Sequence, residues 1–399
     1  MVWGEQYESY PQQAQNMDNI VDLSTYTSSS NVALTTDGNI KTWKDIHSYH
    51  QIPVFKEAMP DSATIQDITS DCDKTCVALK DGTVWCWGSN IDGMHGLSSS
   101  TPLQITGLFN ISAFETSCYS GTETALRNDG TVWNWGENKM GQLGNGMTEN
   151  SAIPVQVKNL ENVISVSSDS WHSLALKNDG TVWAWGINDF GQLGDATTID
   201  RNLPVRVLNL DNIVEISTAI SHCLALKNDG TVWAWGANWS GLLGDGTTIE
   251  RHKPVQLSSL SDIVAVRSNI SLNLALKSDG TVWTWGNSQN NVLIPWRIPD
   301  LENIVEIDIS GESCIARASN ADIWVWGRVW NDYSFDYSYY PILLKNIPGV
   351  SKIKAGYACF YFFMEDDTVW MWGHEKANIP SDIFIISVLR FKSRKLQIK

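Results

Sequence analysis

Few residues of this chain have the types and spacing that catalysis requires. His172 is followed by Ser173, and His222 occupies the equivalent place fifty residues later. Neighbouring residues of an extended strand point to opposite faces, so His172 and Ser173 cannot work together as base and nucleophile. A triad would need partners from other parts of the chain. No pair of carboxylates stands out either, and we expect no catalytic residues and no enzyme activity.

Two further motifs raise the question of bound ligands. Cys72-x-x-x-Cys76 and His47-x-x-His50 fall on different expected strands or loops and have no third ligand in view, whereas structural zinc sites have four. The glycine-rich strings "GQLGNG" at 141–146 and "GLLGDG" at 241–246 match neither a P-loop nor a dinucleotide fingerprint, and no lysine follows. We expect these strings to be turns, and we predict no metal and no cofactor.

The cysteines favour a structural role. There are seven, an odd number with no Cys-x-x-Cys, which argues against a disulfide framework. Cys76, Cys223 and Cys314 stand where Ser173 stands in its own repeat, and Cys359 lies close to that place. We interpret them as small buried residues.

Charge argues against nucleic acid as a partner. The formal net charge is −16 and the body of the chain has no long run of like charges, so a phosphate-binding surface is not expected. The one basic segment is the C-terminal tail, which we interpret as solvated, with an electrostatic tether as the alternative. Its basic residues are Arg390, Lys392, Arg394, Lys395 and Lys399.

The sequence predicts neither a membrane span nor a signal peptide. No stretch reaches the roughly 18 apolar residues that cross a bilayer, and the first residues lack a secretory pattern. As written, the chain is expected in the cytoplasm. Val2, Trp3 and Gly4 resemble the end of a repeat, so a secreted precursor with a longer N-terminus stays an alternative.

Internal repetition dominates the chain. The string "LALKNDGTVWAWG" occurs at 174–186 and again at 224–236, and Gly130, Gly180, Gly230 and Gly280 are 50 residues apart. Eight units end near 44, 88, 136, 186, 236, 286, 327 and 373. A period of this length is typical of solenoids and propellers.

Each unit is expected to contain four short strands. In one unit these are "VISVSS" (163–168), "SLALK" (173–177), "TVWAWG" (181–186) and "LPVRVL" (203–208), with Asn178-Asp179-Gly180 as a hairpin turn and Pro204 opening the outer strand. The pattern predicts an all-β fold, a β-propeller of four-stranded blades. We expect one propeller domain over residues 1–388, followed by a tail at 389–399.

The tryptophans fit this architecture. Trp183 and Trp185 are two apart on a strand and share one face, while Val182 and Ala184 face the other way. The chain has 20 tryptophans, and most of them occupy this slot. We expect the indole rings to lie between neighbouring blades, where they bury a large apolar area.

The string "LALKNDGTVWAWG-N--GQLGDGTT" resembles the repeat of the regulator of chromosome condensation family, especially its tryptophan-rich bacterial members. The resemblance covers nearly the whole chain and is most specific over 110–286. It implies a propeller of seven blades, whereas eight units are counted. The family favours seven, with the first unit and its "TWK" outside the ring; an eight-bladed ring is the alternative.

The loops after each Trp-Gly differ between units, and they leave the third strands at the same end. One face of the disc should therefore carry the variable residues, which are rich in the types that anchor partners. For Met140 and Phe190, the alternative is that the side chains pack onto their own blades instead of contacting a partner. The predicted partner-binding residues are Met140, Phe190, Trp239, Trp330, Tyr333, Phe335 and Tyr337, the last four on an expected loop at 327–341.

These observations favour a monomeric, non-enzymatic protein that presents this face to another protein. The resemblance implies two finer alternatives. A bacterial relative inhibits β-lactamases through aromatic loop residues, and the family's name-giving activity is nucleotide exchange on a small GTPase through a β-wedge inserted in a blade. The central units keep their spacing of 50 and show no such insertion. Light sensing, as in a plant relative, is weaker because only Trp171 stands before a second strand.

Overall fold

The computed structural model describes the backbone of residues 12–13, 20–26, 30–35, 40–43, 65–70, 74–79, 81–88, 99–115, 121–169, 171–286, 293–310, 313–331, 334–344, 347, 349–356, 359–365 and 369–373. Within these ranges, the side chains of 12–75, 328–337 and 369–373, among others, lie outside the description.

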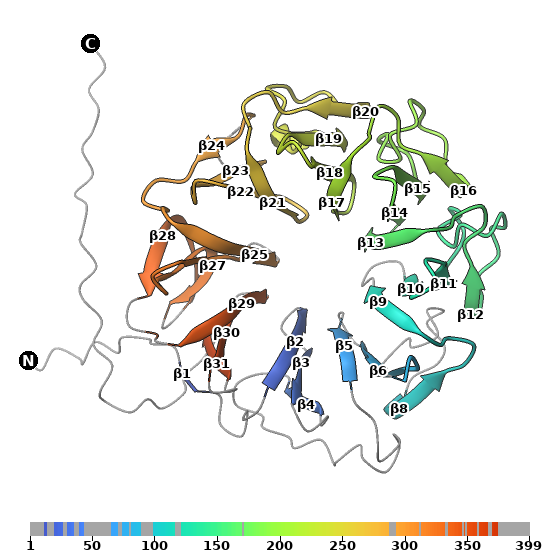
Figure 1. Ribbon diagram of the computed structural model, residues 1–399, viewed down its shortest axis with the longest axis horizontal. Helices are drawn as coiled ribbons and strands as arrows, with labels where there is room; N and C mark the ends of the chain where they lie inside the picture. The colour runs from blue at the N-terminus through green and yellow to red at the C-terminus, as the bar shows by residue number, and fades with distance from the viewer. Residues whose placement is uncertain are drawn as a thin grey trace, which may run out of the picture.

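Antiparallel sheets follow one another around a closed ring (Figure 1). The first three sheets contain β2 (Ile20–Tyr26), β3 (Ser30–Thr35) and β4 (Ile40–Trp43); β5 (Ile65–Ser70), β6 (Lys74–Leu79), β7 (Val84–Gly88) and β8 (Ser99–Ile105); and β9 (Ile111–Glu115), β10 (Glu123–Arg127), β11 (Val132–Gly136) and β12 (Ser151–Gln156). The next two contain β13 (Val163–Asp169), β14 (His172–Lys177), β15 (Val182–Gly186) and β16 (Arg201–Arg206); and β17 (Ile213–Thr218), β18 (His222–Lys227), β19 (Val232–Gly236) and β20 (Arg251–Gln256).

The last three sheets complete the ring. They contain β21 (Ile263–Ser268), β22 (Asn273–Lys277), β23 (Val282–Trp285) and β24 (Trp296–Arg297); β25 (Ile304–Ser310), β26 (Ser313–Ala318), β27 (Ile323–Asn331) and β28 (Ser334–Leu344); and β29 (Val350–Gly356), β30 (Cys359–Met364), β31 (Val369–Gly373) and β1 (Gln12–Gln13). The one helical element among the described residues is a 3₁₀ turn, Trp239–Gly241.

The ends of the chain meet in one sheet. Strand β1 pairs antiparallel with β31, with Gln12 opposite Met371, so the N-terminal segment supplies the outer strand of the last blade and closes the ring. The fold is the predicted all-β propeller. Among the described strands, seven sheets have the full four strands. The first repeat unit forms the three-stranded sheet of β2, β3 and β4, and β2 contacts both β5 and β29, so this unit takes a place in the ring and the expectation that it lies outside is wrong.

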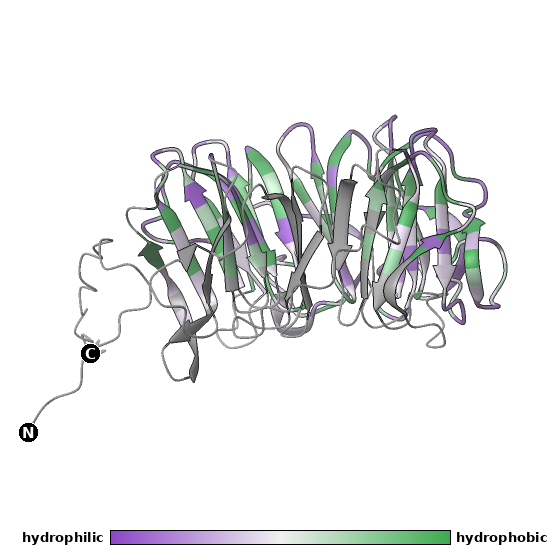
Figure 2. Ribbon diagram, turned by 90° about the horizontal axis from the view of Figure 1, so that it is seen from below, coloured by the Kyte–Doolittle hydropathy of each residue, from purple (hydrophilic) through white to green (hydrophobic). Residues whose placement is uncertain are grey.

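Each blade has its first strand nearest the centre of the ring and its fourth at the rim (Figure 1). Because the second and third strands are antiparallel, the Asp-Gly turns and the loops after Trp-Gly lie at opposite ends of the strands. We call the side with turns 178–180 and 228–230 the turn face, and the side with loops 137–150, 187–200 and 237–250 the loop face. Figure 2 shows the disc from its edge, with the strands running between the two faces.

The Asp-Gly-Thr-Val-Trp string forms a hydrogen-bonded relay at each turn. The carboxylate of Asp179 accepts hydrogen bonds from the backbone N–H of Thr181 at 3.0 Å and from its hydroxyl at 2.6 Å. The same hydroxyl oxygen accepts the indole N–H of Trp183 at 3.3 Å. The hydrogen bond from the Thr181 side chain lowers the pKa of Asp179. The relay repeats from Asp129, Asp229 and Asp279, so this string has a structural role.

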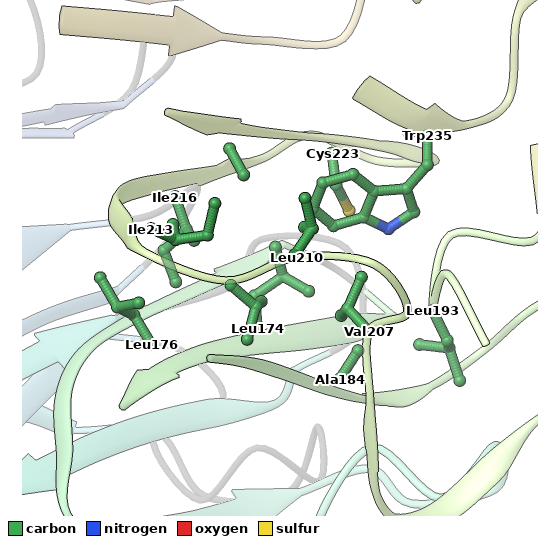
Figure 3. Close-up of a cluster of buried hydrophobic side chains, with 12 residues drawn as sticks. Leu174, Leu176, Ala184, Leu193, Val207, Leu210, Ile213, Ile216, Cys223 and Trp235 are labelled. Atoms are coloured by element: carbon green, nitrogen blue, oxygen red, sulfur yellow. The ribbon is translucent and has the colours of Figure 1, made fainter. Parts of the chain in front are cut away.

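Where its side chain is described, the second tryptophan of a pair is buried, and Trp185, Trp235 and Trp285 lie between blades, as predicted. Trp235 of β19 is fully buried among residues of the preceding blade, including Leu174, Leu176 and Ala184 (Figure 3). Its indole N–H donates to the carbonyl oxygen of Gln192 in that blade at 2.8 Å. Trp185 and Trp285 make the equivalent bonds to Gln142 and Leu242. The first tryptophans of the pairs are only half-buried.

The second glycine of the "GQLG" loops leaves room for these rings. A Cβ added to Gly194 would lie 3.1 Å from the indole nitrogen of Trp235, and one added to Gly244 would lie 2.7 Å from Cδ1 of Trp285. Atoms at such distances overlap, because carbon atoms pack at about 3.5–4.0 Å. These glycines therefore let a loop of one blade lie directly on the buried tryptophan of the next.

Three details differ from the expectations. The prolines of the outer strands do not open them: Pro154, Pro204 and Pro254 are the fourth residues of β12, β16 and β20, because these strands begin to pair earlier, beyond a bulge. At the rim no further strand pairs with this edge, so the missing N–H of proline costs no hydrogen bond between strands.

Cys76 is not a free buried thiol. It is directly opposite Cys86 on neighbouring strands, with the Cα atoms 4.1 Å apart, and the two sulfurs form a disulfide. The odd cysteine count concealed this pair, since opposition across a hairpin requires a known register. Cys223 and Cys314 are buried, as predicted.

The aromatic segment at 327–341 is not a loop. β27 and β28 continue past Gly327 as a paired hairpin in which Trp330 is opposite Phe335 and Arg328 is opposite Tyr337. Alternating aromatic residues are good strand formers, so this segment extends the blade instead of leaving it.

One residue of the loop face has an unfavourable backbone conformation for its type. Ala196 has φ +71°, whereas the equivalent places hold Gly146 at +83° and Gly246 at +82°. The left-handed region costs a residue with a Cβ about 1 kcal/mol, partly offset by the greater unfolded-state entropy of glycine. We expect A196G to raise the urea unfolding midpoint and G246A to lower it. Equal midpoints for both variants would contradict this explanation.

Candidate functional site

A buried asparagine organises each described loop of the loop face. Asn188 follows β15 by two residues, and its amide N–H groups donate to the carboxylate of Asp195 at 3.2 Å and to the carbonyl oxygens of Thr197 and Ile199, both at 3.1 Å. Its side-chain oxygen accepts the backbone N–H of Leu193 at 2.9 Å. Asn138 and Asn238 make comparable bonds in their own loops. The loops are therefore held in a defined shape before any partner binds.

Neighbouring blades also hold the loops. The backbone N–H of Ala196 donates to the carbonyl of His252 in the next blade at 2.8 Å, and that of Gly146 donates to Asn202 at 2.7 Å. Within the loops, Arg201 pairs with Asp195 at 2.6 Å, and Arg251 pairs equivalently with Asp245. A ligand would meet a rigid surface, which lowers the entropic cost of binding.

The predicted contact residues on these loops differ in exposure. Trp239 exposes 53% of its surface and Met140 exposes 37%. Phe190 is half-buried and meets the Trp239 ring edge to face, with ring centroids 4.6 Å apart and an interplanar angle of 82°. The structure thus brings Phe190 and Trp239 of adjacent blades together and leaves the indole accessible. It shows no comparable ring contact for Met140.

The other four predicted residues are only partly described. The backbones of Trp330, Phe335 and Tyr337 lie in the β27–β28 hairpin, which follows the third strand of its blade and so leaves at the same end as the loops. Their side chains, and Tyr333 altogether, lie outside the described residues.

His172 and His222, the two histidines at equivalent places of the repeat, are buried. The Nε2 atom of His172 lies 3.1 Å from the sulfur of Cys223 in the next blade, and Nε2 of His222 lies 2.9 Å from the side-chain oxygen of Asn273. Burial lowers the pKa of His172 to about 3 and that of His222 to about 4. Both are neutral near pH 7. Since His172 and Cys223 are fully buried, this pair meets no substrate and links two blades.

The metal-site candidates find no support in the described structure. Cys76 is bonded to Cys86 and is not available as a thiolate ligand. His47, His50 and Cys72 lie outside the described residues. Among the residues that are described, no group of three or more histidine, cysteine, aspartate or glutamate side chains is placed to hold a metal ion.

Two features of the loop face escaped the sequence reasoning. The organising asparagine could have been recognised from its fixed place two residues after Gly88, Gly136, Gly186 and Gly236. The second feature is a pair of exposed isoleucines near the ends of the loops, Ile199 and Ile249, with 60% and 61% of their surface accessible. Little in the sequence indicates their exposure, because a repeated apolar residue normally indicates a core position. Over the described part of the chain, no helix is long and apolar enough to cross a membrane.

Comparison with known proteins gives the same architecture. The chain is similar to the human protein WBSCR16 with a TM-score of 0.60 and 19% identity, over 78% of this chain and 86% of that chain. It is similar to RCC1 (Prp20) of yeast, solved with Kap60, with a TM-score of 0.60 and 19% identity, over 81% and 83%. The C-terminal WD40 domain of Sif2 gives 0.55 and 10%, over 93% and 100%. These likenesses show the fold.

No curated protein matches the chain in sequence. The family model of the RCC1-like domain matches residues 4–294, which is well over half of the chain and includes the units whose Trp-Gly ends lie at Gly88, Gly136, Gly186, Gly236 and Gly286. The chain belongs to the RCC1-like domain family.

Proposed function

We propose that this propeller is a non-enzymatic protein that binds another protein through its loop face. The observation that carries the proposal is the exposed indole of Trp239, which stands on a loop fixed by Asn238 and against Phe190 of the preceding loop. A large aromatic residue on a rigid support is typical of a binding hot spot. The repeated buried asparagines satisfy the hydrogen bonds of their own loops. The place of Trp239 instead differs between blades and holds Lys139 and Asp189 in the preceding loops.

The central experiment replaces Trp239 with alanine. The protein should be used as bait in extracts of the source organism, and proteins retained by the wild type but lost by W239A should be identified and titrated. We expect W239A to weaken binding of such a partner by more than about 1 kcal/mol, with a thermal midpoint within about 2 °C of the wild type, because Trp239 lies at the surface with 53% of its area exposed.

V264A is a suitable matched variant, since Val264 is an equally exposed apolar residue near the turn face. It should leave partner binding unchanged. A large fall in the midpoint of W239A would instead make this tryptophan a structural residue and would contradict the proposal. If the retained partner is an enzyme, assaying its activity with and without the propeller tests the inhibitor alternative directly.

A second candidate is nucleotide exchange on a small GTPase. The observation in its favour is the β27–β28 hairpin, which extends one blade beyond its neighbours, and one similar structure is described by its binding to Gsp1p and histones. Release of labelled GDP from loaded small GTPases tests it. Accelerated release that is lost on shortening the hairpin at residues 329–336 would favour this candidate over inhibition.

A further inference from the structure

The outward charges of the loop face are mostly negative. Loops 137–150, 187–200 and 237–250 contain no arginine. Their exposed ionisable residues are one lysine and four acidic residues: Lys139, Glu149, Asp189, Asp200 and Glu250. Arg201 and Arg251, which follow the last two loops, are already paired with Asp195 and Asp245. The surface around Trp239 therefore carries an excess of negative charge.

Two of these carboxylates belong to the loop of Phe190. Asp189 precedes that residue, and Asp200 accepts a hydrogen bond from the backbone N–H of Asn188 at 2.8 Å. Partial desolvation of its carboxyl, and to a lesser degree the negative charge of Asp189, raise the pKa of Asp200, although the residue as a whole is exposed. Among the described residues, neither carboxylate has a salt-bridge partner within 4.0 Å. Two like charges thus share a loop without a cation to compensate them.

These residues belong to two loops that touch through the Phe190 and Trp239 rings. We call them the acidic aromatic patch: Asp189, Phe190, Ile199 and Asp200 on one loop, and Trp239 on the other. A guanidinium or ammonium group is attracted to an indole face by about 0.5–2 kcal/mol, and carboxylates add charge-assisted hydrogen bonds. The aliphatic stem of an arginine or lysine also packs on apolar side chains. The patch therefore offers each part of such a side chain a matching contact.

We infer that the protein partner of the loop face presents a basic segment, with an arginine or lysine side chain seated on Trp239 and compensated by Asp189 and Asp200. This inference rests on the proposed function and narrows the partner to one of basic, partly apolar chemistry. Arginine suits the patch better than lysine, because its planar group both stacks on aromatic rings and bonds carboxylates in pairs.

The test uses the whole chain as bait for a displayed library of random peptides, with W239A for counter-selection. Peptides that depend on Trp239 should be enriched in arginine and lysine over glutamate and aspartate. A synthetic copy of the best peptide should bind D189N/D200N at least about tenfold more weakly than the wild type, and its affinity should fall with added salt. Asn at position 200 keeps an acceptor for the Asn188 N–H.

The matched control is E161Q/D300N, which removes the same number of charges from exposed residues on the turn face and should bind like the wild type. Peptides that depend on Trp239 but show no basic enrichment, or equal binding by D189N/D200N and the wild type, would overturn the inference and leave the proposed function intact. Failure to select any Trp239-dependent peptide would overturn both.

Discussion

Replacing Trp185 with alanine is expected to lower the free energy of unfolding by about 3–5 kcal/mol. The indole is fully buried and packs against Leu126, Val132 and Val157 of the preceding blade. Its removal leaves a cavity and deprives the Gln142 carbonyl of a donor that lies 2.8 Å away. Urea unfolding followed by circular dichroism measures the change, and the midpoint should fall while the slope stays near that of the wild type.

Trp183 provides the control on the same strand. Its ring is half-buried and its N–H donates to Thr181 within the same turn, so W183A should cost clearly less than W185A. Equal losses for the two variants would mean that both rings contribute alike, and a W185A loss below about 1 kcal/mol would contradict the position of this indole between blades.

Acidification is expected to destabilise the propeller well before its carboxylates titrate. Burial lowers the pKa of His172 to about 3 and of His222 to about 4, against about 6.5 in the unfolded chain. Below pH 6.5 the unfolded state therefore binds protons that the folded state does not. The stability present above pH 6.5 is lost as the pH falls toward these lower values, by about 2 kcal/mol for each histidine at pH 5.

The blade that follows that of His222 suggests the control for this prediction. The place of His172 and His222 is occupied there by Leu272, which is also buried. The difference in unfolding free energy between pH 7.5 and pH 5 should be smaller by about 2 kcal/mol in H172L than in the wild type. An unchanged difference would show that His172 is protonated in the folded protein at pH 5, contrary to its burial between blades.

Much of the fold could be predicted from the sequence because the repeat is self-consistent. The spacing of Asp179, Gly180, Trp183 and Trp185 specifies a turn, a strand and a buried face at once, and repetition makes the closed ring the simplest way to bury those faces. The Cys76–Cys86 disulfide could not be predicted, because it depends on which residues are opposite across a hairpin.

The candidate site was less predictable. The exposure of Trp239 followed from its variable loop position, but its contact with Phe190 depends on how adjacent blades approach one another, which no single repeat encodes. The β27–β28 hairpin was mistaken for a loop because the glycines equivalent to Gly327, such as Gly186 and Gly236, end the third strands of their blades. Asn188 was overlooked because one polar residue in a glycine-rich loop gives no sign that it is buried.

Hydrogen exchange of the tryptophan indole N–H groups tests the central claim most directly. In ¹⁵N-tryptophan-labelled protein, assigned by single Trp→Phe variants, the indoles of Trp185 and Trp235 should be protected by a factor on the order of 10⁴ or more, because they are released only by large-scale opening. Trp239 should exchange at nearly the rate of a free indole. Rapid exchange at Trp185 and Trp235, or strong protection at Trp239, would contradict an architecture in which buried indoles join the blades and the loop face stays free for a partner.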